Sequence, residues 1–230
     1  MKYKHVFFDL DRTLWHFEKN SQETLVEIIS DMNLSKEGVE TLPLIETYRK
    51  INEECWGLYR KGLMQKEELR VVRFQRALEH HGVMDKAKAE HMADAYVEIS
   101  PTKTHLCEGA IPMLDYLKSK GYALHIITNG FAEVQYIKLA NSGLKGFFGE
   151  VIVSEEVGYK KPHIEVFSAA LSSAGANKIE SIVIGDDLEA DIGGARNAGI
   201  DQVYYNPDQE AHDDQTTFEI IHLEEIHNIL

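Results

Sequence analysis

The chain is poor in cysteine and proline, and it has no long apolar run. Of its 230 residues only two are cysteines, Cys55 and Cys107, and five are prolines. Two cysteines so far apart in the chain provide neither a disulfide framework nor the ligand spacing of a zinc site. No apolar stretch has the length of a membrane span or of a signal-peptide core. We therefore expect a cytoplasmic protein that stays reduced and has no membrane partner.

Positive charge is also scarce. The chain has 24 Lys and Arg against 38 Asp and Glu, which gives a formal net charge of -14. Proteins that bind nucleic-acid polymers usually carry a basic surface, so no such partner is expected. A single small phosphorylated ligand is still compatible with this charge if a local lysine and a metal ion offset the acids. The hydrophobic fraction of 43% is ordinary for a globular protein.

The most informative feature is a pair of aspartates that follows a short apolar run. The run 6–8 is typical of a buried strand. Asp9 and Asp11 come directly after it, and the period of two places them on the same side of the chain. Two carboxylates this close favour a cation or a proton between them, and one can attack as a nucleophile while the other transfers a proton. An acidic strand-to-turn junction without catalysis is the alternative.

The rest of the chain shows two different patterns. Apolar residues at helical spacing predict only helices between 17 and 100, at 21–29 with Ser21 as its N-cap, 41–60, 67–81 and 86–99. Beyond 101, strands alternate with helices. The expected strands are 123–127, 150–153, 181–184 and 202–205, and the expected helices are 109–119, 131–141, 164–173, 190–198 and 223–230.

This alternation predicts an α/β fold with a doubly wound parallel sheet. The core would be discontinuous, formed by 1–16 and 101–230, with 17–100 inserted as an all-helical cap domain. An insertion just after the first strand would stand over the carboxyl edge of the sheet, where open α/β sheets bind ligands, as a lid does.

Two polar clusters follow later strands and would reach the same edge. Thr128 and Asn129 precede Gly130 at the start of a helix, where a hydroxyl, an amide and backbone N–H groups can hold an anion. Capping of that helix is the simpler alternative. Lys161 precedes Pro162, which keeps the lysine out of the following helix and allows it to point into a site.

A third, acidic cluster follows the strand 181–184. Asp186 would leave this strand on the side of Asp9 and Asp11, and three carboxylates form a hard oxygen site suited to Mg²⁺. Asp187 and Asp191 come next, and Asp191 could orient Lys161 or a water molecule on the metal. An acidic loop that only caps a helix is again the alternative.

Taken together, the clusters resemble the four motifs of the haloacid dehalogenase-like (HAD) hydrolase superfamily, helical-cap subfamily. They match as Asp9-x-Asp11-x-Thr13, Thr128, Lys161-Pro162 and Gly185-Asp186-x-x-x-x-Asp191. The resemblance implies a strand order of 5-4-1-2-3 and a phosphate transfer through an aspartyl-phosphate. Asp9 would be the nucleophile and Asp11 the acid and base.

The same resemblance implies the ligand contacts. Thr128 and Lys161, with Asn129, would hold the phosphoryl group. Asp9, Asp11 and Asp186 would bind Mg²⁺, with Asp187 and Asp191 orienting the metal or its ligands.

Within the superfamily, the chain is similar to the pyrimidine 5'-nucleotidase-like branch. The matching segments are Asp11-x-Thr13-Leu14-Trp15-x-Phe17, Ile51-Asn52-x-x-x-Trp56, Glu68-Leu69-Arg70-x-x-Arg73-Phe74 and Thr128-Asn129-Gly130-Phe131 with Gln135. Arg12 and His16 depart from the usual residues of the branch. The resemblance implies a Mg²⁺-dependent 5'-nucleotidase acting on pyrimidine nucleoside monophosphates, as a monomer or weak homodimer.

Three other functions stay open. One is a phosphatase of sugar phosphates or other small metabolites, another a β-phosphoglucomutase-like isomerase, and the third an inactive binding protein. A dehalogenase would not need the second acid, Asp11. The cap aromatics Phe17, Trp56 and Tyr59 are candidates for stacking on a base, although aromatic residues at helical spacing are typical of a core.

Overall fold

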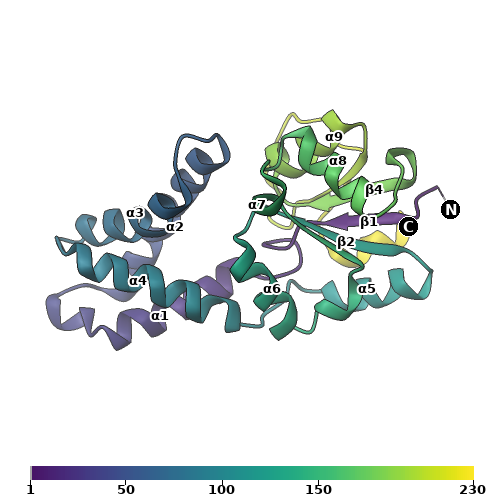
Figure 1. The fold of residues 1–230 in the computed structure, drawn as a ribbon. Helices are drawn as coiled ribbons and strands as arrows, with labels where there is room; N and C mark the ends of the chain where they lie inside the picture. Colours follow the sequence, from purple (N-terminus) through teal and green to yellow (C-terminus); the bar gives the residue numbers. More distant parts are fainter. Residues whose placement is uncertain (1) are drawn as a thin grey trace. The chain divides into compact units, whose positions relative to one another are not determined.

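The computed structural model describes residues 2–230 and divides the chain into two compact units. One unit joins the chain up to Phe17 to Thr104–Leu230, and the other is Glu18–Lys103. Figure 1 shows the first as an α/β unit and the second as a set of helices. The two parts of the α/β unit are therefore far apart in the sequence.

The α/β unit is built on a sheet of six parallel strands in the order β3-β2-β1-β4-β5-β6. The strands are β1 (His5–Phe8), β2 (Ala123–Thr128), β3 (Glu150–Val153), β4 (Ser181–Gly185), β5 (Asp201–Tyr205) and β6 (Phe218–Ile220). The order 5-4-1-2-3 is confirmed, and β6 extends it at one edge. Phe8 pairs with Ile126 and Ile184, so β1, β2 and β4 end at the same level.

Alternate side chains of the central strands enter two different cores. Val6 and Phe8 belong to the core formed with α5 (Ala110–Ser119), α6 (Ala132–Asn141) and the 3₁₀-helix η6 (Leu223–Asn228). Phe7 enters the opposite core, against α8 (Ile164–Ser173) and α9 (Gly194–Ala198). Helices thus cover both faces of the sheet (Figure 1). Strands buried on both sides explain why the sequence shows short continuous apolar runs.

Some elements differ from the expectation. The predicted helix 190–198 begins as a π-helix, η5 (Leu188–Gly193), and becomes α-helical only in α9. The predicted terminal helix 223–230 is the 3₁₀-helix η6, fixed at its start by a capping box between His222 and Glu225. The short β6 and α7 (Ser154–Val157) were not predicted, because segments of three or four residues have too little periodicity to be recognised. Two further 3₁₀ turns are η3 (Lys145–Phe147) and η4 (Lys178–Glu180).

The other unit is helical throughout, and none of its described residues forms a strand. Its elements are α1 (Phe17–Asp31), η1 (Leu34–Glu37), α2 (Thr41–Arg60), α3 (Lys66–His80), α4 (Lys86–Ile99) and η2 (Ser100–Thr102). The prediction that Ser21 is an N-cap was wrong. Ser21 lies buried inside α1 and accepts a hydrogen bond of 2.9 Å from the Tyr96 hydroxyl. Nowhere in residues 2–230 does a helix combine the length and apolar character needed to cross a bilayer.

Candidate active site

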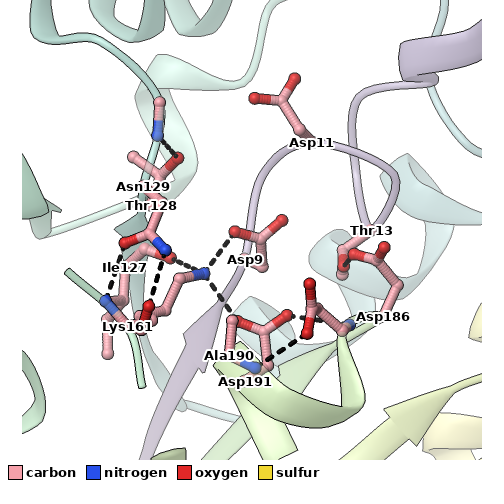
Figure 2. A network of polar contacts seen from close by, with 12 residues as sticks. Asp9, Asp11, Thr13, Ile127, Thr128, Asn129, Lys161, Asp186, Ala190 and Asp191 are labelled. Atoms are coloured by element: carbon pink, nitrogen blue, oxygen red, sulfur yellow. Dashed lines mark hydrogen bonds and ion pairs between the residues drawn. The ribbon is translucent and has the colours of Figure 1, made fainter. Parts of the chain in front are cut away.

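Four strand ends and loops bring the predicted site residues to the carboxyl edge of the sheet. Asp9 follows β1, Thr128 ends β2, and Asp186 follows β4. Lys161 comes from the segment between α7 and α8. Figure 2 shows these side chains around one point, with Lys161 extended between Asp9 and Asp191. The fold thus brings together residues that are up to 182 positions apart, from Asp9 to Asp191.

Lys161 is the centre of this group. Its Nζ lies 2.5 Å from Asp9 Oδ1 and 2.6 Å from Asp191 Oδ1, and it donates a third hydrogen bond of 2.9 Å to the Ile127 carbonyl. The residue is only 3% exposed. All three protons of the ammonium therefore have partners, and the side chain is fixed with its charge beside the candidate nucleophile.

Burial and mutual repulsion dominate the electrostatics of the acids. Burial raises the pKa of Asp9 to about 7, although the charge of Lys161 opposes this shift and that of Asp191 adds to it. Burial, together with the charges of Asp9 and Asp191, also holds the pKa of Asp186 well above its usual value. Burial alone would lower the pKa of Lys161, but Asp191 and Asp9 raise it above the ordinary range, so the lysine stays charged. One buried cation faces three carboxylates, and the group has an excess of negative charge.

This excess fits a divalent cation. Asp9, Asp186 and Asp191 each offer a carboxylate oxygen, and these oxygens lie within 4.8 Å of one another. Such an all-oxygen set is typical of Mg²⁺ sites. Asp191 has both oxygens in hydrogen bonds, to Lys161 and to the Asp187 backbone N–H, which leaves Asp9 and Asp186 as candidates for direct ligands. Thr13 donates to Asp186 Oδ1 over 2.8 Å and orients it.

Asp11 lies apart from this group (Figure 2). Its Oδ1 is 2.5 Å from Lys138 Nζ, and its Oδ2 accepts a hydrogen bond of 3.1 Å from Gln135 Nε2. The roles of Asp11 as acid, base and metal ligand stay predictions. Lys138 is a candidate functional residue that the sequence reasoning missed. The feature of the sequence that could have indicated Lys138 is its position one turn after Gln135, on the helix that follows Thr128.

The other predicted residues have structural contacts that explain their position. Asn129 binds the backbone of Lys161 twice, donating to its carbonyl over 3.0 Å and accepting from its N–H over 2.8 Å. Thr128 Oγ1 accepts from the Gly130 N–H over 3.1 Å. Asp187 caps η5 by accepting from the N–H groups of residues 189 and 190. Contact of Asn129 or Thr128 with a phosphoryl group, and of Asp187 with metal ligands, stays a prediction.

Two glycines make room for this arrangement. A Cβ on Gly185 would lie 2.3 Å from Asp191 Oδ2, and one on Gly130 would lie 2.0 Å from Gln135 Nε2. Neither position has the left-handed backbone that usually selects glycine. These glycines are therefore explained by the close approach of a site side chain to the backbone.

A doubly wound α/β unit with a buried Asp–Lys–Asp group at its strand ends defines a class of hydrolase, and the comparisons agree. A family model described as haloacid dehalogenase-like hydrolase matches residues 6–205, so the chain belongs to this family. The chain is 31% identical over 232 residues to the HAD-hydrolase YfnB of Bacillus subtilis, covering 100% of this chain and 96% of that protein. A crystal structure of YfnB bound to magnesium gives a TM-score of 0.90 at 30% identity and covers 100% of this chain and 99% of that one.

Named phosphatases are also among the relatives. The pyrimidine 5'-nucleotidase PynA of Streptococcus pneumoniae is 33% identical over 90% of this chain and 85% of its own length. The glyceraldehyde 3-phosphate phosphatase of Methanopyrus kandleri is 32% identical over 94% of this chain and 92% of its own length. The chain is thus an enzyme, a HAD-type phosphatase, and relatives of this kind act on small phosphorylated compounds.

Proposed function

We propose that the protein is a Mg²⁺-dependent phosphomonoesterase that works through an aspartyl-phosphate on Asp9 and prefers pyrimidine nucleoside monophosphates. The observation that carries the proposal is the buried contact of Asp9 with Lys161 beside Asp186. A carboxylate held in this way can approach phosphorus, because the lysine offsets the charge of the incoming phosphate.

The residues have the following roles in this proposal. Asp9 attacks the phosphorus, and the bond to the leaving oxygen breaks as that oxygen takes a proton from the Asp11 carboxyl. A water molecule then attacks the phosphorus and gives its proton to Asp11, and the bond between phosphorus and the Asp9 oxygen breaks. Inorganic phosphate leaves, and both residues are restored. Lys161 and Thr128 bind the phosphoryl oxygens. Asp9 and Asp186 would hold Mg²⁺, which supplies charge neutralisation.

Two observations support the preference for nucleotides. One is the names of relatives, and the other is a pair of aromatic residues in the helical unit that are candidates for stacking on a base. PynA and the Escherichia coli protein YjjG, which is 30% identical over 90% of this chain, are both named pyrimidine 5'-nucleotidases. In the helical unit, Trp56 is half-buried and packs edge-on against Tyr59 with ring centroids 5.5 Å apart. Stacking of a base on an aromatic ring contributes roughly 1–3 kcal/mol in nucleic-acid complexes.

A panel of phosphomonoesters tests this proposal. With Mg²⁺, the purified protein should release inorganic phosphate from UMP and CMP with a higher kcat/KM than from glycerol phosphate or hexose phosphates. EDTA should remove the activity, and added Mg²⁺ should restore it. Undiminished turnover after exhaustive chelation would refute the metal requirement.

A sugar-phosphate phosphatase is the second candidate. It is favoured by two glyceraldehyde 3-phosphate phosphatases, which match the chain at 30–32% identity over 88–94% of its length. If the panel shows triose or hexose phosphates hydrolysed best and nucleotides hardly at all, the nucleotidase assignment fails and this second function replaces it. Interconversion of sugar phosphates without phosphate release would indicate an isomerase.

A further inference from the structure

Asp11 has both carboxylate oxygens engaged by residues of α6. Lys138 Nζ lies 2.5 Å from Oδ1, and Gln135 Nε2 lies 3.1 Å from Oδ2. Asp11 is not among the three acids whose oxygens gather within 4.8 Å. The residue that should transfer a proton at the phosphate therefore lies apart from the nucleophile, held by two donors on one helix face.

The two donors are themselves fixed. The side chain of Lys138 is 4% exposed, whereas that of Asp11 is 26% exposed. Lys138 Nζ also lies 4.0 Å from the centroid of the buried Trp15 ring, a cation–π contact. Gln135 is 1% exposed and occupies the space left by the missing Cβ of Gly130. A buried lysine between an aromatic face and one carboxylate differs from a mobile surface ion pair, because its side chain is already ordered.

We propose that Lys138, assisted by Gln135, is a positioning residue that holds Asp11 away from Asp9 in the resting enzyme. This inference rests on the phosphatase function proposed above. Asp11 then has two positions, one bound to Lys138 and one beside the leaving oxygen, and the proton transfer requires the second. The ion pair sets how often Asp11 occupies that second position.

Esters with different leaving groups separate this role from a structural one. Nitrophenolate leaves without a proton, whereas the alkoxide of a simple alkyl phosphate needs one from Asp11. The quantity to compare is kcat/KM for the alkyl ester divided by kcat/KM for p-nitrophenyl phosphate, because kcat/KM reports the steps up to the first irreversible one. A uniform loss of folded enzyme or of metal would leave this ratio unchanged.

Lys138→Met removes the charge and keeps an apolar stem over Trp15. It should raise the ratio by at least about two- to fivefold, because exposed ion pairs give effects of this size and the side chain of Lys138 is already ordered. Lys138→Arg, which retains an ion pair with Asp11, should keep the ratio of the parent protein. Lys120→Met is the matched control, since Lys120 is an exposed lysine that lies 5.4 Å from the Tyr116 ring. A crystal structure with Mg²⁺ and vanadate should show Asp11 released from Lys138.

Two outcomes would overturn the inference. An unchanged ratio in Lys138→Met means that the ion pair does not control Asp11. A ratio that falls, or Asp11 still bound to Lys138 in the vanadate complex, means that Asp11 transfers its proton while it is bound to Lys138. If the parent protein hydrolyses neither ester, the phosphatase function itself fails, which is a different result.

Discussion

At the scale of single residues, the site is an unbalanced cluster of buried charges. Lys161 is fully bonded to Asp9, Asp191 and a backbone carbonyl, and yet burial still keeps the pKa of Asp9 and Asp186 high. A buried carboxylate without enough positive charge is costly. A divalent cation would relieve this cost, and its binding should be visible in both activity and stability.

The first prediction concerns the metal ligand Asp186. Asp186→Ala removes a direct ligand candidate and should raise the Mg²⁺ concentration for half-maximal activity by roughly tenfold or more. Mg²⁺ should increase the melting temperature of the parent protein and have a smaller effect on the variant. Equal Mg²⁺ dependence of both proteins, measured by activity and by thermal shift, would exclude Asp186 as a ligand.

The second prediction concerns His125, a buried residue of β2. Burial and the neighbouring His5 lower its pKa to about 4, with Glu150 opposing the shift. In the unfolded chain a histidine titrates near 6.5. Between these pH values the unfolded chain binds a proton that the folded protein does not. The contribution of neutral His125 to the free energy of unfolding is therefore fully present above about pH 6.5 and decreases as the pH falls towards 4.

His125→Phe tests this assignment. Phenylalanine keeps the stack on Phe7, whose centroid lies 4.8 Å from that of His125, and cannot bind a proton. The loss of melting temperature between pH 7.5 and pH 5 should be smaller in the variant than in the parent protein. The same loss in both proteins would show that other groups cause the acid sensitivity.

At the scale of elements, most of the long helices were predicted within one residue of their bounds, whereas α1, predicted as 21–29, extends over Phe17–Asp31, and short helices such as α7 were missed. The bounds of α2, α4 and α8 follow directly from apolar periodicity. The π-helix η5 could not be predicted in this way, because its shape depends on distant contacts. Asp191 must reach Lys161, and Gly194 must fit against Phe167 of α8.

Part of the site could also be predicted from the sequence. Asp9 and Asp186 directly follow strands in the sequence, so their meeting at one sheet edge could be expected. The ion pair of Asp11 with Lys138 joins residues 127 positions apart, and the helical spacing of Lys138 from Gln135 does not indicate that Asp11 is their partner. The backbone of Arg12 could not be predicted either. Its φ is 70°, a conformation that arginine rarely adopts and that the sequence does not indicate.

The third prediction tests the packing of α9. A Cβ on Gly194 would lie 2.5 Å from Phe167 Cε2 and 3.0 Å from the backbone Cα of Pro162. Gly194→Ala should therefore destabilise the protein by about 1–3 kcal/mol, the usual range for overpacking. It should also lower activity, because Pro162 follows Lys161.

Gly57→Ala is the matched control in α2. A Cβ at this position would meet no atom within 4 Å. Alanine is the better helix former, and the variant should be more stable than the parent protein by up to about 1 kcal/mol. Denaturant unfolding of both variants measures the two effects, and a Gly194→Ala variant as stable as the parent would contradict the packing argument.

At the scale of the whole molecule, the residues proposed for the chemistry all belong to one of the two units. The α/β unit holds all the acids and the lysine of the site, while the helical unit carries Trp56 and Tyr59, two of the candidates for stacking on a base. Relatives named for nucleotides and for sugar phosphates match the chain at 30–33% identity. Relatives of both kinds match the chain at similar identity, so the comparisons show the phosphatase class while the substrate has to be measured.

The central claim is that Asp9 becomes phosphorylated. The most direct measurement is mass spectrometry of the acid-quenched protein during turnover of UMP with Mg²⁺, together with phosphate release by Asp9→Asn. We expect a phosphoryl adduct on the peptide that contains Asp9. Asp9→Asn should be folded by circular dichroism and release no phosphate, because an amide cannot replace the carboxylate nucleophile. Phosphate release by Asp9→Asn near the parent rate, or an adduct on another residue, would contradict the account.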